Sequence, residues 1–260
     1  MPQDAKDEPA SSNINKLQYV RSKKLNAGYP NLSEAKVQLK KQFKQKLPSG
    51  LDSLPSGWEW ATLMQVSVIV VDCHNKTAPY TNEGIPLIRT TNIRNGELNF
   101  RELKYITEET YERWAARTYP EPGDILITRE APMGEACIIP EGLRLCMGQR
   151  IMLIRLHPDF VDRQYILYTI QAPCLMDRVQ DKPVGATVQH LRVGGVETML
   201  IPVPPLAEQR RIVAKVDQLM ALVDELETQL AVSRATGKDL LEALVAELTA
   251  ANMPSLEVTP

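Results

Sequence analysis

The most regular hydrophobic pattern in the chain follows a proline-rich segment near the C-terminus. Pro202, Pro204 and Pro205 exclude a helix interior there, but Pro205 suits a first helical turn, where its missing N–H is not needed. Glu208 then falls where the helix dipole favours an anion. Beyond it, apolar residues recur at steps of 4, 3, 4, 3 and 4, a repeat typical of helices that pair along a seam. The predicted helix-pairing interface consists of Ile212, Val216, Leu219, Val223, Leu226 and Leu230.

The same heptad spacing, continued toward the C-terminus, reaches Ser233 and Gly237, which interrupt the apolar pattern. We therefore expect a bend or helix–helix turn near Ser233–Lys238, followed by a second apolar helix over Leu240–Leu248. The alternative is a helix buried in the core of a globular domain. The strict alternation of the steps favours helix pairing.

The middle of the chain consists of short apolar stretches separated by turn signals. It begins at Trp58-Glu-Trp60, and Val66–Val71 is rich in β-branched residues. Asn95-Gly96 is a strong hairpin turn signal. Strands are predicted over Ile85–Arg89, Asp124–Thr128, Glu135–Ile139, Gln149–Leu156 and Thr198–Val203. Short helices are predicted from Thr107 to about Arg117, over Asp159–Ile170 and over Cys174–Val179. The fold class is therefore α+β, with an antiparallel or barrel-like sheet before the long C-terminal coiled-coil-type helix.

The N-terminal region is polar and then basic. Residues 1–13 are expected to be loose, whereas Lys16–Lys46 contains nine Lys or Arg residues and one acid. Ser33 can cap a helix that runs to about Gln45. This helix would be a phosphate-binding arm, a helix docked on the C-terminal coil, or a solvated linker helix. A repeated Leu-Pro-Ser-Gly phrase, at 47–50 and 54–57, indicates a linker with turns.

Composition limits the class of protein. Hydrophobic residues make up 43% of the 260 residues, enough for a core, and the net charge of −2 gives no argument for nucleic acid. The four cysteines show no C-x-x-C spacing and the three histidines are scattered, so we expect reduced thiols and no metal site. No apolar run approaches the length of about 18 residues that spans a bilayer. We therefore expect a cytoplasmic protein without a membrane segment.

Motifs of catalysis are not found in the sequence. There is no G-x-G-x-x-G before a helix, no G-K-[ST] phosphate loop and no N-P-P-Y tetrapeptide of amino-methyltransferases. Glu102-Leu-Lys104 has the E-x-K phrase of many nucleases, but no suitably spaced Pro-Asp precedes it. Surface charge explains that phrase better. The sequence therefore predicts no catalytic residue and no cofactor bound by this chain.

Polar loops between the strands carry side chains of the types that suit readout of base edges. Arginine pairs bidentately with guanine, Asn or Gln pairs with adenine, and threonine contacts phosphates. Turns are rich in such residues in any protein, and Arg129 beside Glu130 could be a plain ion pair. The candidate DNA-binding residues are Arg89, Thr90, Thr91, Asn92, Arg94, Thr128, Arg129, Gln149, Arg150, Thr187, Gln189 and His190.

A resemblance gives these loops a context. The matching phrases lie at 54–60, 85–89, 122–128, 133–134, 185–190 and 201–210, the last reading Ile-Pro-Val-Pro-Pro-Leu-Ala-Glu-Gln-Arg. They cover about residues 54–231, and the last phrase before a heptad helix is quite specific. The chain resembles the specificity subunit of type I restriction–modification systems. Such subunits pair a mostly β target recognition domain with a conserved helical spacer, and they carry no chemistry themselves.

The resemblance implies an organisation and a set of partners. The boundaries expected from it are a basic arm or linker with a short helix at 1–53, a target recognition domain at 54–203, a helical spacer or dimerisation region at 204–252 and a disordered tail at 253–260. The implied partners are double-stranded DNA, a methylase subunit and a restriction nuclease–translocase subunit. The complex, rather than this chain, would use S-adenosylmethionine, ATP and Mg.

One departure from the family pattern changes the expected assembly. Family members usually carry two recognition domains and two helical regions, whereas this chain has one of each. It therefore resembles a half-subunit that reads one half of a bipartite target and needs a second copy of itself or another half. A coiled-coil adaptor or anti-restriction decoy, which binds methylase subunits without reading DNA, is the alternative. An autonomous nuclease is disfavoured by the missing carboxylate cluster.

Overall fold

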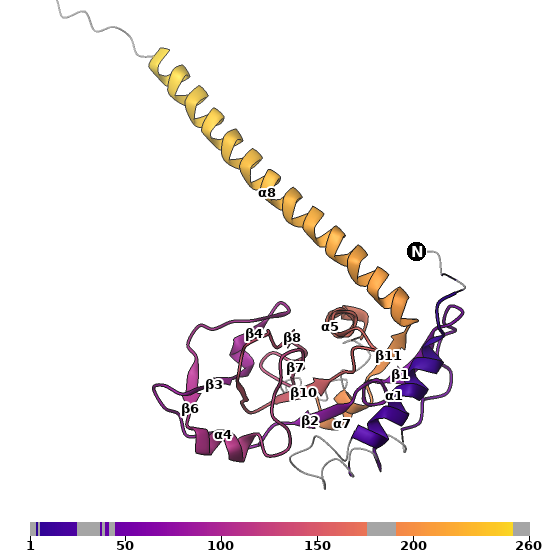
Figure 1. The fold of residues 1–260 in the computed structure, drawn as a ribbon. Coiled ribbons are helices and arrows are strands. Elements are labelled where there is room, and N and C mark those ends of the chain that lie inside the picture. The colour runs from indigo at the N-terminus through magenta and orange to yellow at the C-terminus, as the bar shows by residue number, and fades with distance from the viewer. Residues whose placement is uncertain are drawn as a thin grey trace, which may run out of the picture. The chain divides into compact units, whose positions relative to one another are not determined.

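The computed structural model describes residues 4, 6–24, 37, 40–41, 45–175 and 191–251 (Figure 1). Most of the predicted helices at 33–45 and 174–179, the loop that holds Thr187, Gln189 and His190, and the tail at 253–260 lie outside the described residues. The chain divides into two compact units, Met1–Ile212 and Val213–Pro260.

The elements follow the predicted order, with many short strands before one long helix. The helices are α1 (Ala10–Lys24), α3 (Leu63–Val66), the 3-10 turn η1 (Thr90–Asn92), α4 (Glu108–Trp114), α5 (Arg163–Gln171), α7 (Val193–Glu197) and α8 (Leu206–Ala251). The strands are β1 (Glu59–Thr62), β2 (Ile69–Asp72), β3 (Ile85–Ile88), β4 (Ile93–Arg94), β5 (Glu97–Leu98), β6 (Lys104–Ile106), β7 (Ile125–Thr128), β8 (Ala136–Ile138), β9 (Cys146–Met147), β10 (Ile151–Arg155) and β11 (Leu200–Val203). The predicted α+β class is confirmed.

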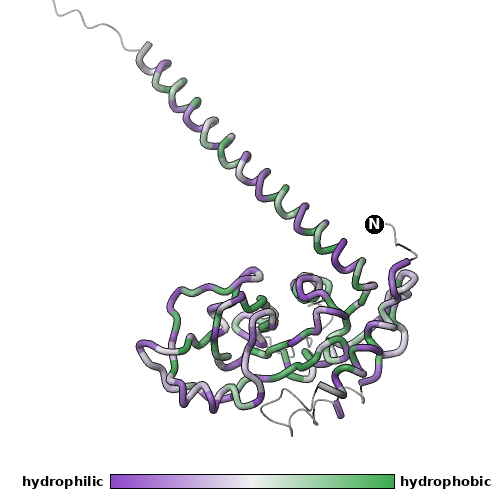
Figure 2. The backbone as a smooth tube through the Cα atoms, viewed as in Figure 1, coloured by the Kyte–Doolittle hydropathy of each residue, from purple (hydrophilic) through white to green (hydrophobic). Residues whose placement is uncertain are grey.

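The principal sheet is antiparallel, with the strand order β2-β10-β7-β8. Ile151, Met152, Leu153 and Ile154 of the central strand β10 are all buried, so both faces of this strand are covered. Figure 2 shows hydrophobic residues concentrated in the strands of the first unit. A smaller sheet, β6-β3-β9, pairs β3 with β9 in parallel.

Local signals fixed several elements as expected. Thr107 caps α4 by accepting a hydrogen bond from the Thr110 backbone N–H. Asn95, with a φ of +53°, and Gly96 form the turn of the β4–β5 hairpin. Asp162 caps α5 by accepting bonds from the N–H groups of the next turn. The predicted cap at Thr107 and the predicted hairpin turn are confirmed, because each depends on neighbouring residues alone. The helix predicted over Asp159–Ile170 begins later, at Arg163, directly after the Asp162 cap.

Three buried thiols lie in the core of the first unit. Burial raises the pKa of Cys137 and of Cys146 to about 12, and it also raises the pKa of Cys73. These thiols therefore stay protonated at neutral pH and behave as small apolar groups. Cys174 is exposed, and none of the four forms a disulfide.

Helix α1 corrects the expectation for the N-terminal region. Residues 1–13 were expected to be loose, but α1 begins at Ala10, whose N–H donates to the Gly57 carbonyl oxygen at 3.0 Å. Arg21 is 1% exposed, and its Nη1 donates to the carbonyl oxygens of Met64 at 2.9 Å and Ser67 at 3.0 Å. These two carbonyls lie at the C-terminal end of α3, where a helix leaves acceptors unsatisfied. At this end of the basic stretch, an arginine serves the fold.

Helix α8 corrects a second expectation, the bend near Ser233–Lys238. The helix runs unbroken from Leu206 to Ala251, so no second helix begins at Leu240. Gly237 costs only about 1 kcal/mol relative to alanine in a helix, and no proline lies between Leu206 and Ala251. Figure 2 shows hydrophobic and hydrophilic residues alternating along its length.

The first turn of α8 is fixed within the first unit. Glu208 accepts a hydrogen bond from the Trp58 indole N–H at 3.1 Å, and the fully buried Gln209 donates to the Pro204 carbonyl oxygen at 2.9 Å. Gln209 also accepts from the Asp162 N–H at 2.8 Å. Arg211 forms an ion pair with Asp7 at 2.5 Å, which raises the pKa of Arg211. The helix therefore begins from a rigid base.

The burial of Arg21 gives a test of the role of α1. Arg21→Ala removes two charge-assisted hydrogen bonds and leaves both carbonyls without that donor, so the free energy of unfolding should fall by about 2–4 kcal/mol. Urea unfolding measures this. The control is Lys16→Ala in the same helix, whose exposed ammonium pairs with Glu8 and should have little effect. A loss for Arg21→Ala no larger than the small loss for Lys16→Ala would contradict a stabilising role of the two Arg21 hydrogen bonds.

Candidate nucleic-acid interface

A polar pocket lies where the parallel strands β3 and β9 end. Parallel strands bring their carboxyl ends to one edge, so the loops after Ile88 and Met147 meet there. Gly148 makes this possible, because its N–H donates to the Ile88 carbonyl oxygen at 2.7 Å and an added Cβ would lie only 2.7 Å from that oxygen. The pocket has a volume of about 150 Å³. We call it the β3–β9 pocket, and its lining includes Arg89, Thr90, Thr91, Gln149 and Arg150.

Five of the predicted DNA-binding residues therefore come together from two loops that lie about sixty residues apart in sequence. Among the described residues that line the pocket, Arg89 and Arg150 are positively charged and no residue is acidic. Such a lining is suited to an anionic or hydrogen-bonding ligand.

Arg89 is partly held and partly uncommitted. Its Nη2 donates to the Glu102 carbonyl oxygen at 2.9 Å, while its Nε is buried without a hydrogen-bond partner. Buried donors of native proteins are almost always paired, so this N–H is able to bind an acceptor that a ligand supplies. The Nε–H of Arg89 is therefore a buried donor that the pocket can offer to a ligand.

The second loop presents its side chains differently. Gln149 is half-buried, and its Oε1 lies 3.3 Å from the Thr77 hydroxyl. Arg150 has a φ of +67°, a backbone region that non-glycine residues rarely adopt. Its guanidinium pairs with Glu130 at 2.6 Å yet stays 53% exposed. The loop thus holds one amide and one guanidinium at the rim.

Two of the predicted DNA-binding residues, Asn92 and Arg94, form hydrogen bonds with the backbone of their own loops. Asn92 is 1% exposed, and its Oδ1 accepts from the Arg89 N–H at 3.0 Å. Its Nδ2 donates to the carbonyl oxygens of Asn99 at 2.9 Å and Arg101 at 3.0 Å. Arg94 donates to the Thr90 carbonyl oxygen at 2.6 Å. Asn92 therefore shapes the loop that carries Arg89, and its amide is already used.

Thr128 and Arg129 form a supporting cluster outside the pocket. The buried Thr128 hydroxyl donates to the Pro132 carbonyl oxygen at 2.6 Å and accepts from the Glu135 N–H at 3.0 Å. Arg129 is 6% exposed and pairs with Asp72 at 3.3 Å, so the ion pair with Glu130 considered from the sequence is not the one that forms.

The backbone of Arg129 connects three loops. Its N–H donates to the Arg150 carbonyl oxygen and its carbonyl oxygen accepts from the Leu191 N–H, both at 2.8 Å. Leu191 follows the segment that contains Thr187, Gln189 and His190, which are outside the described residues. The chain therefore leaves that segment beside the Arg129 and Arg150 loops.

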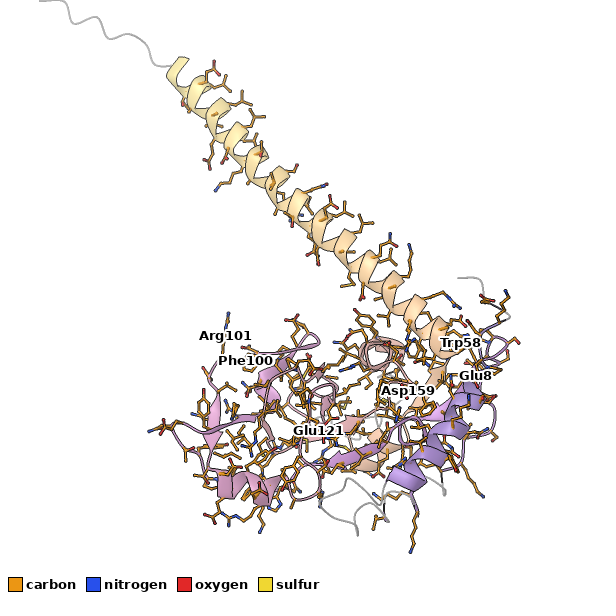
Figure 3. The ribbon with its side chains drawn as sticks, viewed as in Figure 1. Glu8, Trp58, Phe100, Arg101, Glu121 and Asp159 are labelled. Carbon is orange, nitrogen blue, oxygen red and sulfur yellow. The ribbon has the colours of Figure 1, made fainter. Side chains whose placement is uncertain are left out.

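Two exposed aromatic residues, Tyr80 and Phe100, were not among the predicted site residues. Thr77 and Tyr80 line the β3–β9 pocket from the loop before β3, and Tyr80 is 48% exposed. Phe100 is also about half exposed, and Figure 3 shows it beside Arg101 at the edge of the domain. An aromatic residue within a polar loop was the available signal in both cases.

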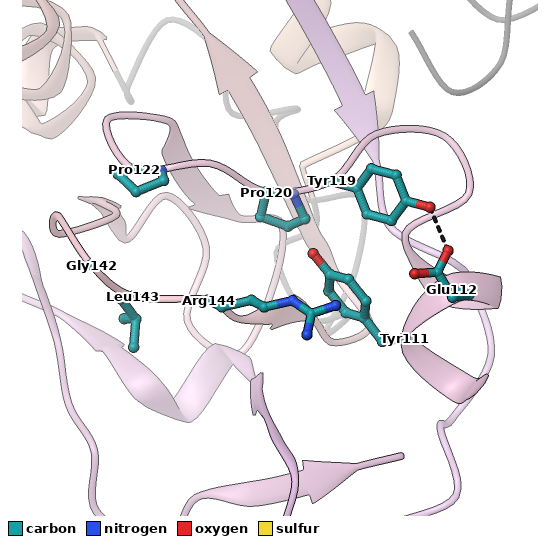
Figure 4. A pocket seen from close by; sticks show the side chains of 8 residues that line it. All are labelled: Tyr111, Glu112, Tyr119, Pro120, Pro122, Gly142, Leu143 and Arg144. Carbon is teal, nitrogen blue, oxygen red and sulfur yellow. Dashed lines mark hydrogen bonds between the residues drawn. The ribbon is translucent and has the colours of Figure 1, made fainter. Parts of the chain in front are cut away.

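A larger cavity, of about 520 Å³, lies between α4 and two loops (Figure 4). The guanidinium of Arg144 lies 4.5 Å from the ring centre of Tyr111 and pairs with Glu108, which raises the pKa of Arg144 and lowers that of Glu108. Tyr119 donates to Glu112, a bond that raises the pKa of Tyr119. The polar side chains of this larger cavity therefore bond to one another or to neighbouring residues. None of the predicted DNA-binding residues lines the cavity.

The second predicted interface is the apolar face of α8. Leu219, Val223, Leu226 and Leu230 are each 44–54% exposed, whereas Ile212 and Val216 are half-buried. Soluble proteins rarely expose apolar residues in such a regular series unless a partner covers them.

The described part of the chain shows no group of His, Cys, Asp and Glu side chains that could hold a metal ion. It also contains no helix that is both long enough and apolar enough to cross a membrane.

The fold is thus a small α+β domain that presents polar loops and continues into a long helix. Residues 55–232 match the family model described as the type I restriction modification DNA specificity domain. The chain belongs to this family, whose specificity subunits are non-catalytic, and the prediction that it is not an enzyme rests on that membership.

Curated relatives agree with the family. The chain is 28% identical over 258 residues to the type I restriction enzyme EcoAI specificity subunit of Escherichia coli, and 26% identical over 266 residues to the EcoEI specificity subunit of the same species. Each match covers 96% of this chain and 41% of the relative. The chain therefore spans less than half the length of these relatives.

Solved structures share the fold. The HsdS subunit from Thermoanaerobacter tengcongensis matches with a TM-score of 0.54 and 22% identity, over 92% of this chain and 55% of that one. A chain from a structural study of type I R-M complex assembly matches with a TM-score of 0.57 and 22% identity, over 91% and 55%.

The position of Asn92 gives a test of how the interface is built. Asn92→Ala leaves one backbone N–H and two carbonyl groups without their partner, so the free energy of unfolding should fall by about 1–3 kcal/mol. Thr91→Ala, at the exposed neighbouring position, should leave stability unchanged. Thermal or urea unfolding compares the two. Similar stabilities would mean that the Asn92 amide is free to face a ligand.

Proposed function

We propose that the chain is the DNA sequence-specificity component of a type I restriction–modification complex and reads one half of a bipartite target. The observation that supports this most is the β3–β9 pocket, where Arg89, Thr90, Thr91, Gln149 and Arg150 meet in a member of the specificity family. We infer that the chain corresponds to one recognition domain, at 54–203, with one helical spacer, at 204–252.

The chemistry of the pocket agrees with readout of base edges. A guanidinium can donate two bonds to guanine, and a glutamine amide can both donate to and accept from adenine. Threonine hydroxyls and backbone N–H groups suit phosphate oxygens, which position the protein without reading sequence. Gln149 and Arg150 are therefore proposed as readers, with Thr90 and Thr91 as phosphate contacts.

The charge of the domain implies help from other subunits. Trp58–Val203 contains 15 basic and 18 acidic residues, so the electrostatic attraction to phosphates is weak. We propose that DNA binding depends on a methylase subunit, and that a nuclease–translocase subunit joins the same complex. S-adenosylmethionine, ATP and Mg would then be used by those subunits.

The coiled-coil adaptor or anti-restriction decoy remains the second candidate, because α8 exposes its apolar face over most of its length. A gel shift with the methylase subunit present separates the two functions. The specificity subunit should make the complex prefer particular sequences, whereas an adaptor should confer no preference.

Substitutions in the pocket test the proposed readers. If Gln149 or Arg150 contacts a base, alanine at that position should cost about 1–3 kcal/mol of binding free energy and relax the preference at one position. If the residue contacts phosphate, all sequences should weaken together and the salt dependence should fall. Competition binding of the methylase complex to a library of DNA sequences measures both effects.

The matched control is Arg113→Ala on α4, which removes the same charge from an exposed position outside the β3–β9 pocket. Arg129 is unsuitable for this purpose, because it is buried against Asp72 and its loss would disturb the fold. Unchanged binding in both pocket variants, with the protein folded, would refute the proposed site.

A further inference from the structure

The turn between β5 and β6 presents an aromatic ring outside the core. Phe100 lies at the tip of this turn and is 49% exposed, whereas Leu98 and Leu103 on either side pack against the hydrophobic core. Figure 3 shows Phe100 beside Arg101 at the edge of the first unit. Single exposed aromatic residues are common on protein surfaces and need no explanation by themselves. The surroundings of Phe100 therefore decide whether its exposure has a function.

The backbone on both sides of Phe100 is held from beneath. The buried Asn92 amide donates to the Asn99 carbonyl oxygen at 2.9 Å and to the Arg101 carbonyl oxygen at 3.0 Å. The Asn99 N–H donates in return to the Asn92 carbonyl oxygen at 2.7 Å, and the Asn99 side chain accepts from the Arg101 N–H at 2.9 Å. The residues that flank Phe100 thus have fixed partners, and the ring is mounted on a rigid tip.

The same supports also build the β3–β9 pocket. Arg89 lines that pocket, and its Nη2 donates to the Glu102 carbonyl oxygen at 2.9 Å. Glu102 has a φ of +52°, which a non-glycine residue adopts only where its surroundings enforce it. Thr91 lines the pocket as well and directly precedes Asn92. The pocket and the ring of Phe100 therefore belong to one surface, because the same side chains position both.

Arg101 adds a positive charge beside the ring. Within the part of the chain that the structure describes, its guanidinium forms no hydrogen bond and no ion pair, although the exposed Glu102 follows it directly. Arginine side chains are the commonest contacts of DNA phosphates, which position a protein on the duplex. The tip of the turn therefore offers one apolar ring and one uncommitted cation.

We propose that Phe100 inserts between two adjacent base pairs of the bound DNA and partly unstacks them, with Arg101 on a neighbouring phosphate. Proteins that kink DNA use apolar side chains in this way, together with arginine or lysine. A rigid mount is needed, because a flexible turn would fold away from the duplex before the base stack opened. This inference rests on the proposed DNA-reading function.

Insertion of the ring gives the chain a second way to read sequence. The free energy that unstacking costs depends on the base step and is lowest at pyrimidine–purine steps such as TA and CA. Phe100 should therefore favour such a step beside the bases that contact the β3–β9 pocket. It would do so without a hydrogen bond to any base.

A protein partner explains the same ring less well. Aromatic residues that dominate protein interfaces lie at the centre of a well-packed patch from which water is excluded. The neighbours of Phe100 at the tip are Asn99, Arg101 and Glu102, which are all polar or charged. An isolated ring with a cation beside it suits DNA, because base pairs offer flat faces for stacking and the adjoining backbone is anionic.

The fluorescence of 2-aminopurine, which rises when the base is unstacked, tests the insertion. The probe replaces purines one at a time in the DNA that the methylase complex selects, and the complex is saturating and contains the full chain. The wild-type protein should raise the fluorescence at one step. Phe100→Ala should abolish that rise, remove the pyrimidine–purine preference at the same step and weaken binding about tenfold.

The same DNA contains an internal control for binding. Methyltransferases extrude their target base, so a probe at that base should brighten with either protein. Phe100→Leu keeps an apolar wedge and should retain most of the rise at the inserted step. Arg101→Ala should weaken binding to all sequences together and reduce the salt dependence, while the rise remains.

The matched control on the protein is Tyr19→Ala. It removes another exposed aromatic ring, from α1 at the opposite end of the first unit (Figure 1), and should change neither the fluorescence nor the affinity. Thermal unfolding of Phe100→Ala should match the wild type, because the ring lies outside the core.

The possible failures are distinguishable. A fluorescence profile that is the same for wild type and Phe100→Ala would overturn the insertion and leave the DNA-reading function standing. Loss of the methylase subunit from the Phe100→Ala complex, with an unchanged profile in what remains, would make Phe100 a protein contact and also overturn it. A wild-type complex without any sequence preference contradicts the proposed function itself, and the insertion with it.

Discussion

The pairing of β1 with β11 is the constraint on which the first unit depends, because it joins the two ends of the domain. Glu59 lies opposite Val203 in this antiparallel pair, so the linker before β1 and the start of α8 are held together. The Gly57 carbonyl oxygen then receives α1, and Trp58 bonds the first turn of α8. The first turn of α8 is therefore held by hydrogen bonds to the first unit.

A second close contact positions the candidate interface. β3 and β9 are short, and their parallel pairing brings the Gly148 backbone against Ile88. No other residue type fits there without displacing the Ile88 carbonyl, so the approach of the Arg89 and Gln149 loops depends on the missing Cβ. The buried Asn92 amide then fixes the Arg89 loop from the other side. The pocket is therefore built by the backbone contact of Gly148 and by the Asn92 amide, and the arginine and glutamine side chains line it.

The sequence predicted what local residues determine and missed what distant contacts determine. The cap at Thr107 and the hairpin at Asn95-Gly96 depend on nearest neighbours, and both were predicted correctly. Helix α1 lacks a regular apolar face, and its burial depends on carbonyls of α3 more than forty residues away, so composition suggested a solvated region. The bend expected near Ser233 was wrong for a different reason. The strict heptad was extended past Leu230, whereas the apolar residues Leu241 and Leu248 lie one residue beyond the heptad positions.

The candidate site shows the same division. Polar loops between strands were evident from the sequence, but a linear pattern cannot tell a reader from a support. Asn92 and Arg129 have the same chemistry as Gln149 and Arg150, yet the first two are buried and paired within the fold. Only the parallel register of β3 and β9 decides which side chains share a pocket. Three candidates, Thr187, Gln189 and His190, lie outside the described residues and remain predictions.

The charge of the domain explains why the helix matters for the proposed function. With 15 basic and 18 acidic residues between Trp58 and Val203, one recognition domain gains little from the phosphate backbone. If two such domains were joined through α8, as we propose, the second half-site would be bound from a high effective concentration, and weak single contacts would multiply without any new side chain. We propose that the exposed apolar side chains of α8 serve this pairing, because only a paired form would hold both half-sites.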